Sequence, residues 1–280
     1  MIIDIHTHLV DLDTEFGPQL KQDLTRCGIS HDTWRFTEED YLKGTLEADK
    51  AVVFGIKGQK TGWHVSNERV AGFTARHGGK YIFFASVDPL DPKVMDDLKH
   101  CHQDLGCKGI KLGPIYQGVH PHHPVYYKIY EYCQENSLPI MTHMATTFSS
   151  GVPLEYAWPV HMDKVACDFP NLKIILSHLG HPWIGETLSI IRKQENVYAD
   201  LSALYYRPWQ FYNAMLLAAE YGCGNKILFG SDFPATTTQS SIIGLKNVNK
   251  VVEGTNLPKV PLTMIEDIIH RNSLALLGIE

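Results

Sequence analysis

The sequence lacks the features that mark several classes of protein. No apolar run approaches the about 20 residues that a membrane-spanning helix needs. No Gly-x-Gly-x-x-Gly segment follows the first apolar run, which speaks against a dinucleotide-binding fold. Basic residues are not in excess, since 25 Lys and Arg stand against 31 Asp and Glu for a formal net charge of −6. This balance is unlike the basic surface of a nucleic-acid-binding protein.

Cysteine is sparse and scattered. The chain has six cysteines and no Cys-x-x-Cys pair, so neither a disulfide framework nor a zinc ribbon is indicated. The first residues lead directly into an apolar run without the pattern of a secretory signal peptide. We therefore expect a cytoplasmic protein with reduced cysteines, and we expect neither a membrane nor a nucleic acid as its partner.

What the chain does contain is an alternation of short apolar runs with helical patterns. The runs are almost continuously apolar, which is typical of strands buried on both faces. We expect strands at Ile2–Ile5, Ala51–Phe54, Tyr81–Val87, Cys107–Leu112, Pro139–His143, Lys173–His178, Val197–Leu201 and Lys226–Gly230. The expected helices are Thr37–Asp49, Ser66–Arg76, Asp91–Leu105, Pro124–Glu135, His161–Asp168, Ile184–Lys193, Pro208–Tyr221, Ser240–Val252 and Met264–Leu276.

Eight strands alternating with helices predict an α/β protein, a (β/α)8 TIM barrel of regular or distorted form. Such a barrel takes about 250 residues, so residues 1–280 fit one domain. An open doubly wound sheet is the alternative, because periodicity alone does not show closure. The stretch 11–36 has no clear pattern, and we expect an irregular insertion near the barrel mouth.

Polar side chains stand where several expected strands end, which is where TIM barrels place their active sites. His6 and His8 are two residues apart, so their side chains share one face of the first strand. His143 and Asp232 end the fifth and eighth strands. Any one of these histidines could be a hydrogen-bonded core residue. Together the four residues predict a site for one divalent metal ion, Zn²⁺ by preference, with room for water or substrate.

Two residues are candidates for proton transfer. His178 ends the sixth strand and can act as general acid or base, or polarise the substrate. Asp232 can both hold the metal and accept a proton from water, because a bound metal lowers the pKa of that water to about 7. Lys111 ends the fourth strand. It could line the site, be carboxylated to bridge two metals, or be a buried lysine paired with an acid such as Asp200.

Loops after the strands supply the candidate substrate-binding residues. Aromatic rings and a few cations suit a small, flat, carboxylate-bearing substrate. The residues we single out are Lys57, Lys111, Tyr116, Trp183 and Arg207. The histidine-rich segment 120–123 could indicate a second metal site, but we interpret it as an ordinary surface loop.

The whole chain resembles the amidohydrolase superfamily in the order His-x-His, Lys, His, His, Asp along its strands. The segments Gly109–Leu112, Ile175–Trp183, Leu228–Pro234 and His270–Gly278 are similar to the "amidohydrolase 2" branch, which includes aminocarboxymuconate-semialdehyde decarboxylase. The resemblance implies the TIM barrel, one zinc-like ion on His6, His8, His143 and Asp232, catalysis by His178, and a homo-oligomer (dimer or larger). Some decarboxylases of the branch have glutamate as the first ligand, whereas this chain keeps His6.

Two reactions are compatible with this ligand set. We favour hydrolysis of a lactone, ester or amide by a metal-activated water. The alternative is non-oxidative decarboxylation of an aromatic or muconate-type acid, which would make the protein a carboxy-lyase. A barrel that binds a ligand without turnover is the third possibility, and the presence of both His178 and Asp232 argues against it.

Overall fold

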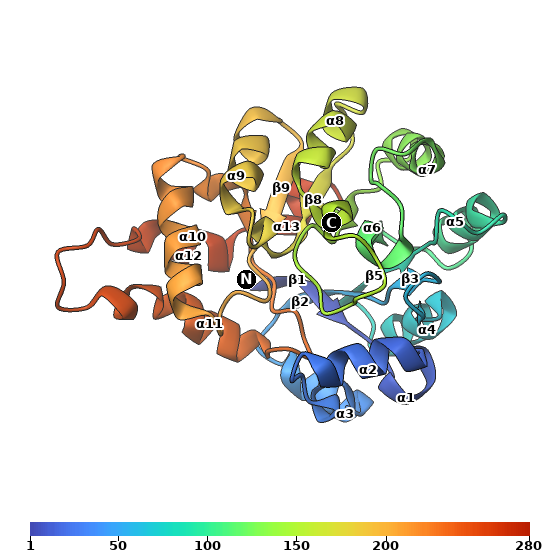
Figure 1. The fold of residues 1–280 in the computed structure, drawn as a ribbon, viewed down its shortest axis with the longest axis horizontal. Coiled ribbons are helices and arrows are strands. Elements are labelled where there is room, and N and C mark those ends of the chain that lie inside the picture. The colour runs from blue at the N-terminus through green and yellow to red at the C-terminus, as the bar shows by residue number, and fades with distance from the viewer.

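The computed structural model describes residues 1–280 as a ring of eight parallel strands surrounded by helices (Figure 1). The strand order is β1-β2-β5-β6-β7-β8-β9-β10, so each strand pairs with the next strand of the barrel along the chain. Backbone hydrogen bonds from Ile5 N to Phe229 O (3.1 Å) and from Asp232 N to His6 O (2.8 Å) join the last strand to the first. The predicted TIM barrel is therefore confirmed.

The eight barrel strands lie where the apolar runs predict them. Their bounds are β1 Ile3–His8, β2 Lys50–Phe54, β5 Tyr81–Ser86, β6 Gly109–Leu112, β7 Ile140–Thr142, β8 Ile174–Leu176, β9 Val197–Asp200 and β10 Ile227–Leu228. A two-stranded hairpin of β3 (Lys57–Gly58) and β4 (Trp63–His64) follows β2, and the sequence pattern had not indicated it.

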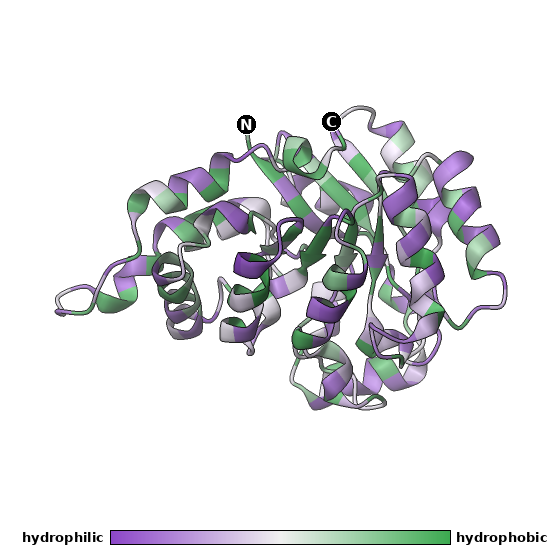
Figure 2. Cartoon of the chain, turned by 90° about the horizontal axis from the view of Figure 1, so that it is seen from above, coloured by the Kyte–Doolittle hydropathy of each residue, from purple (hydrophilic) through white to green (hydrophobic).

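Helices cover the outside of the barrel, with apolar faces toward the strands and polar faces outward (Figure 2). They are α1 Leu12–Glu15, α2 Pro18–Arg26, α3 Glu38–Gly44, α4 Asn67–Arg76, α5 Val94–Gln103, α6 Pro114–Gln117, α7 Pro124–Glu135, α8 Val160–Asp168, α9 Ile184–Lys193, α10 Pro208–Glu220, α11 Thr238–Lys246, α12 Leu262–His270 and α13 Ser273–Leu277. Five 3₁₀ segments add η1 His31–Trp34, η2 Leu154–Ala157, η3 Ser177–Gly180, η4 Gly224–Lys226 and η5 Val248–Val252. None of the helices has the length and apolar character that crossing a bilayer requires.

Several expected segments differ from the structure; among them, Ser240–Val252 is α11 followed by the 3₁₀ segment η5, and Thr37–Asp49 is a helix only as far as Gly44. The stretch 11–36 is not irregular, because it folds into α1, α2 and η1. The helix expected from Asp91 begins three residues later, at Val94 of α5, with Lys93 as N-cap. The expected helix Met264–Leu276 is two helices, which are separated where Arg271 leaves the helical conformation and Asn272 caps α13.

A β-bulge in β1 determines which of its side chains face the barrel interior. Ile3 and Ile5 belong to the apolar cluster inside the barrel, and strict alternation would turn Thr7 inward after them. The bulge adds one residue to β1 relative to β2 and shifts this phase. His6 and His8 then point inward. Both rings make T-shaped contacts with Phe54, at distances of 4.9 and 4.7 Å between ring centroids.

The interior of the barrel is apolar at one end and polar at the other. Its apolar layer consists of Ile3, Ile5, Val52, Phe54, Phe84, Met141, Ile175, Tyr198 and Leu228. Helix α13 packs against the same layer through Leu274 and Leu277 and closes the end where the strands begin. The two chain termini lie on that side of the molecule (Figure 2). The polar layer, toward the strand ends, forms the candidate active site.

Candidate active site

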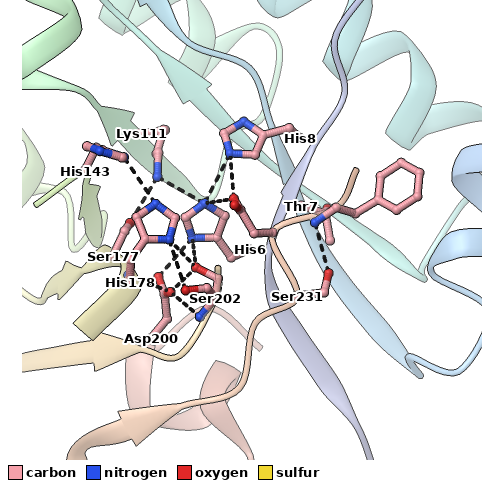
Figure 3. Close-up of polar contacts among 12 residues, drawn as sticks. His6, Thr7, His8, Lys111, His143, Ser177, His178, Asp200, Ser202 and Ser231 are labelled. Atoms are coloured by element: carbon pink, nitrogen blue, oxygen red, sulfur yellow. Dashed lines mark hydrogen bonds and ion pairs between the residues drawn. The ribbon is translucent and has the colours of Figure 1, made fainter. Parts of the chain in front are cut away.

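Three potential ligand atoms meet where β1 and β10 end. The Nε2 atoms of His6 and His8 are 3.2 Å apart (Figure 3). Asp232 Oδ1 lies 3.2 Å from His6 Nε2 and 3.3 Å from His8 Nε2. His6 has no solvent exposure, whereas the Asp232 side chain remains 14% exposed. The cluster is therefore buried behind His6 and open at Asp232.

Asp200, the last residue of β9, orients the His6 ring through its Nδ1 atom, on the side away from the cluster. Its Oδ2 is 2.9 Å from His6 Nδ1, and its Oδ1 accepts the backbone N–H groups of His178 and Ser202, each at 3.0 Å. Burial acts to raise the pKa of Asp200, but the charge and hydrogen bond of His6, the charge of His178 and the hydrogen bond of the Ser202 side chain outweigh it and hold the pKa below its ordinary value. A carboxylate only accepts, so His6 Nδ1 carries the proton and Nε2 turns its lone pair toward the cluster.

His178 reaches the site through an unusual backbone conformation. Alternation along β8 turns Ile175 and Ser177 inward and would turn His178 outward, but its left-handed φ of 60° redirects the side chain into the barrel. Its Nδ1 is 2.8 Å from Ser202 Oγ, which donates to Asp200. The serine oxygen can then only accept from His178, so His178 Nδ1 donates and Nε2 keeps its lone pair.

His143 faces His178 across the polar layer. His143 Nδ1 is 3.2 Å from His178 Nε2 (Figure 3). The other ring nitrogen, Nε2, donates to the backbone carbonyls of Ala145 at 3.1 Å and Thr146 at 3.3 Å. His143 Nδ1 therefore also presents a lone pair, and two lone pairs at this distance repel each other unless a cation lies beside them.

The structure thus brings together all five residues expected for metal binding and catalysis. A ring nitrogen of His6, a ring nitrogen of His178 and a carboxylate oxygen of Asp232 lie within 4.8 Å of one another. His178, which we expect to be catalytic, is part of this closest group, while His143, which we expect to be a ligand, contacts the group through His178.

Lys111 lies beneath the cluster rather than on the cavity wall. It is fully buried, and its Nζ is 3.1 Å from Ser177 Oγ, 3.5 Å from His6 Nε2 and 4.6 Å from the centre of the Phe54 ring. Burial lowers the pKa of Lys111 to about 8, although Asp200 and Asp232 act in the opposite direction. Lys111 therefore contacts the polar layer on the side away from the cavity. Asp200 pairs with His6 and not with this lysine.

The protonation states of the histidines follow from burial and neighbouring charges. Burial lowers the pKa of His8 to about 4 and that of His178 to about 3, and it places the pKa of His143 well below its ordinary value. For His6, burial and Lys111 act against the charged form, but Asp200 and Asp232 outweigh them and raise its pKa. Neutral imidazoles are the form that binds metal.

These donor atoms fit a divalent metal ion. His6 Nε2, His178 Nε2, His143 Nδ1 and the Asp232 carboxylate all present lone pairs, and Lys111 is the one cation among them. Ligand atoms on a tetrahedral ion with bonds of about 2.0–2.1 Å lie about 3.3–3.4 Å apart. The separations of 3.2–3.3 Å among His6, His8 and Asp232 are close to this value.

A cavity of about 490 Å³ opens above the cluster. Its floor includes His8, His143, His178 and Asp232. Of the expected substrate-binding residues, Tyr116 and Arg207 line the cavity. The others do not: Lys111 lies below it, the Lys57 Nζ pairs with Asp97 Oδ2 at 3.4 Å, and Trp183 caps α9 and packs against the outer core.

Several residues of the cavity were not singled out from the sequence as substrate-binding. Trp34 of η1 and Phe148 of the β7–α8 loop lie in segments without periodicity, so the sequence offered no signal for them. The positioning residues Asp200 and Ser202 could have been found, because alternation from Tyr198 turns both of them inward.

Comparisons with known proteins show the family and the fold of this chain. A family model described as "Amidohydrolase" matches residues 3–279. No curated protein matches the chain. Among solved structures, an uncharacterised TIM-barrel protein from Bordetella bronchiseptica superposes with a TM-score of 0.76 at 21% identity, covering 99% of each chain.

Two further structures of the same fold carry named activities. A probable 2-pyrone-4,6-dicarboxylic acid hydrolase from Acinetobacter baumannii, solved with citric acid bound, has a TM-score of 0.70 at 16% identity over 99% of each chain. A dihydroxybenzoic acid decarboxylase from a Polaromonas species, with manganese and the inhibitor 2-nitroresorcinol, has a TM-score of 0.65 at 16% identity over 99% of this chain and 97% of its own. At these identities the likeness shows the fold.

Proposed function

This chain belongs to the amidohydrolase family, and from that premise we propose that it is a metal-dependent hydrolase of a small carbonyl compound bearing a carboxylate, such as a lactone, ester or amide. One observation carries the proposal. His6, His8 and Asp232 meet at 3.2–3.3 Å on the floor of a cavity large enough for a small molecule. Zn²⁺ as the ion, a cytoplasmic location and a dimer or larger assembly are parts of the same proposal.

The ligands we propose are His6, His8, His143 and Asp232. When bound, a divalent ion supplies a Lewis acid and lowers the pKa of water. Asp232 is the base for the attacking water in this proposal, because it lies on the cavity surface and is ionised: His178, His6 and His8 hold its pKa well below its ordinary value despite burial. His178, anchored by Ser202, is the second proton carrier and presents Nε2 to the cavity.

The cavity walls support a carboxylate-bearing substrate. Arg207 lines the cavity and can bind a carboxylate in two-pronged fashion. The indole N–H groups of Trp34 and Trp63 are buried without a hydrogen-bond partner, and both residues line the cavity. Buried donors are nearly always paired in folded proteins, so a substrate oxygen is the partner we expect for them.

Decarboxylation of an aromatic acid is the second candidate, and the aromatic wall favours it. The rings of Trp34, Trp63, Tyr116 and Phe148 border the cavity, and such a wall suits a planar ring. The same ligands would then orient a substrate carboxylate while a protonated group delivers a proton to carbon. In the free site the lowered pKa values of His8 and His178 leave both rings unprotonated at neutral pH, so neither holds the proton that decarboxylation needs, which is why we place hydrolysis first.

Metal analysis combined with a substrate screen tests the proposal. The purified enzyme is assayed in ¹⁸O-labelled water against lactones, esters, amides, and aromatic or muconate-type acids. We expect ¹⁸O in the product and loss of activity after chelation, restored by Zn²⁺. Release of CO₂ without ¹⁸O incorporation would assign the decarboxylase, and full activity without metal would refute both reactions.

The roles of His143 and His178 are separated by matched variants. We expect His178→Asn to reduce turnover by at least about 10²-fold while keeping its metal. His143→Asn should lose metal affinity. If instead His178→Asn loses the metal and His143→Asn keeps it, the two roles are exchanged. The ligand atoms of His178, His6 and Asp232 lie within 4.8 Å of one another, so the experiment distinguishes two real alternatives.

A further inference from the structure

Three other histidines form a group outside the active-site cavity. His120 and His122 lie in the chain between α6 and α7, and His161 lies in the first turn of α8. One ring nitrogen of each is within 4.8 Å of a ring nitrogen of the other two. None of them lines the active-site cavity, so the metal site proposed above does not explain why they come together.

The three rings form a nearly equilateral triangle. Their centroids are 5.4 Å apart for His120 and His122, 5.0 Å for His120 and His161, and 5.0 Å for His122 and His161. Three imidazoles on one tetrahedral ion, with metal–nitrogen bonds of about 2.0–2.1 Å, would place their centroids about 5.2 Å apart. The arrangement therefore matches the spacing of a three-histidine metal site before any ion is considered.

Each of the three rings has a buried nitrogen without a hydrogen-bond partner. These atoms are His120 Nδ1, His122 Nδ1 and His161 Nε2. Buried polar atoms are nearly always paired, so one unpaired nitrogen on every member of a touching group calls for a shared partner. Burial and the neighbouring histidines also lower the pKa of His122 and His161, and neutral imidazoles are the form that binds metal.

We propose that His120, His122 and His161 bind a second divalent transition-metal ion, of the Zn²⁺ type, through these three nitrogens. Three imidazoles leave a fourth position for water or another ligand. Glu155 supports the site from outside, since its Oε1 lies 3.6 Å from His120 Nε2 and can orient that ring. Lys164 is the nearby cation that acts against the bound charge. The sequence alone favoured an ordinary surface loop at this place.

The site joins two segments that border the active-site cavity. His120 and His122 follow α6, which carries Tyr116 of the cavity wall. His161 lies in the first turn of α8. The loop between β7 and this helix contributes Thr147 and Phe148 to the cavity wall. A metal ion held between these segments would fix the two walls relative to each other. We therefore assign it a structural role, separate from the metal ion that takes part in the reaction.

Metal stoichiometry tests this second site without reference to activity. The enzyme with its active-site metal retained is dialysed against micromolar Zn²⁺, and bound metal is counted by mass spectrometry. We expect two equivalents in the wild type, one in His161→Ala and one in His122→Gln. Cobalt added as the second equivalent should give the visible absorption of a tetrahedral imidazole site, and both variants should lack that absorption.

Two controls make the result decisive. His64→Gln removes an exposed histidine elsewhere and should keep two equivalents. His8→Ala should lose the active-site metal and keep the second, so a failure of the proposed hydrolase site is read separately. A wild type whose single equivalent is kept by both His122→Gln and His161→Ala, or variants at His122 and His161 that still bind two, would overturn the proposal. If His161→Ala does not fold by circular dichroism, His122→Gln alone gives the answer.

Discussion

At the scale of single residues, one buried carboxylate organises the candidate active site. Asp200 accepts hydrogen bonds from His6 Nδ1, from the backbone N–H of His178 and from the hydroxyl of Ser202. Through these contacts it sets the tautomer of His6, the first of the proposed metal ligands, and it holds Ser202, which in turn contacts His178. It touches neither the cavity nor the proposed metal position, so its role is positioning.

Replacing this carboxylate by an amide should weaken metal binding. In Asp200→Asn, an amide N–H facing His6 Nδ1 would force the proton onto His6 Nε2, the atom that must face the metal. We expect a 10–100-fold loss of metal affinity, measured by competition with a chromophoric chelator. The control is Asp88→Asn, which changes a buried carboxyl group whose hydrogen bonds go to the backbone of Gln59 and Leu90 and not to the cluster. Equal affinities for the two variants would contradict the positioning role.

At the scale of secondary-structure elements, β1 and α13 act at opposite ends of the barrel. The bulge in β1 turns His6 and His8 into the polar layer, and Gly230 after β10 leaves room for this, since a Cβ there would lie 2.8 Å from His6 Cβ. Helix α13 fills the other end with leucines of the interior cluster. The barrel thus has a closed, apolar base beneath its polar layer.

The contribution of α13 is measurable as a stability difference. Leu277 is 1% exposed and packs inside the barrel, so Leu277→Ala should lower the free energy of unfolding by about 2–5 kcal/mol. Leu262→Ala on α12 is the matched control, because that side chain is 69% exposed and the change should stay within about 0.5 kcal/mol. Urea unfolding compares the two variants, and a Leu277→Ala protein as stable as the control would show that α13 does not close the barrel.

At the scale of the whole molecule, the buried polar layer makes stability depend on pH. His8 and His178 have pKa values lowered by burial from 6.5 to about 4 and about 3, so the unfolded chain binds more protons than the folded one between these values and 6.5. Their protonation therefore favours unfolding. The lowered pKa values of Asp200 and Asp232 act in the same direction once the pH falls below 3.8. His6, with its raised pKa, acts in the opposite direction.

We expect the free energy of unfolding of the metal-free protein to fall by several kcal/mol as the pH decreases from 7 to 4, because the lowered pKa values of His8, His143 and His178 oppose the raised pKa of His6. The measurement is urea unfolding at intervals of half a pH unit. Saturating Zn²⁺ should raise stability at pH 7 and lose this effect in acid, since protons compete for the same nitrogens. A profile that is flat between pH 6.5 and 4 would show that these histidines are not buried in the neutral form.

The sequence by itself determined an α/β fold with eight parallel strands, and it identified the main polar residues at their ends. Eight continuous apolar runs such as Ile140–Thr142 can be buried on both faces only in a parallel sheet covered by helices, so their number and order fixed the fold class. Residues at the strand ends, such as His6 and Asp232, were identifiable because barrel strands deliver their carboxyl ends to one mouth. The family likeness, and the ligand set it implies, rested on the same residues.

Only the tertiary structure decided where these side chains point and what surrounds them. The bulge that turns His6 inward and the left-handed backbone of His178 contradict simple alternation, because pairing and packing with neighbouring strands override the local pattern. The wall of Trp34 and Phe148, and the meeting of His120 with His161, join residues far apart along the chain. Such contacts depend on how loops pack against each other, and no periodicity of the sequence encodes them.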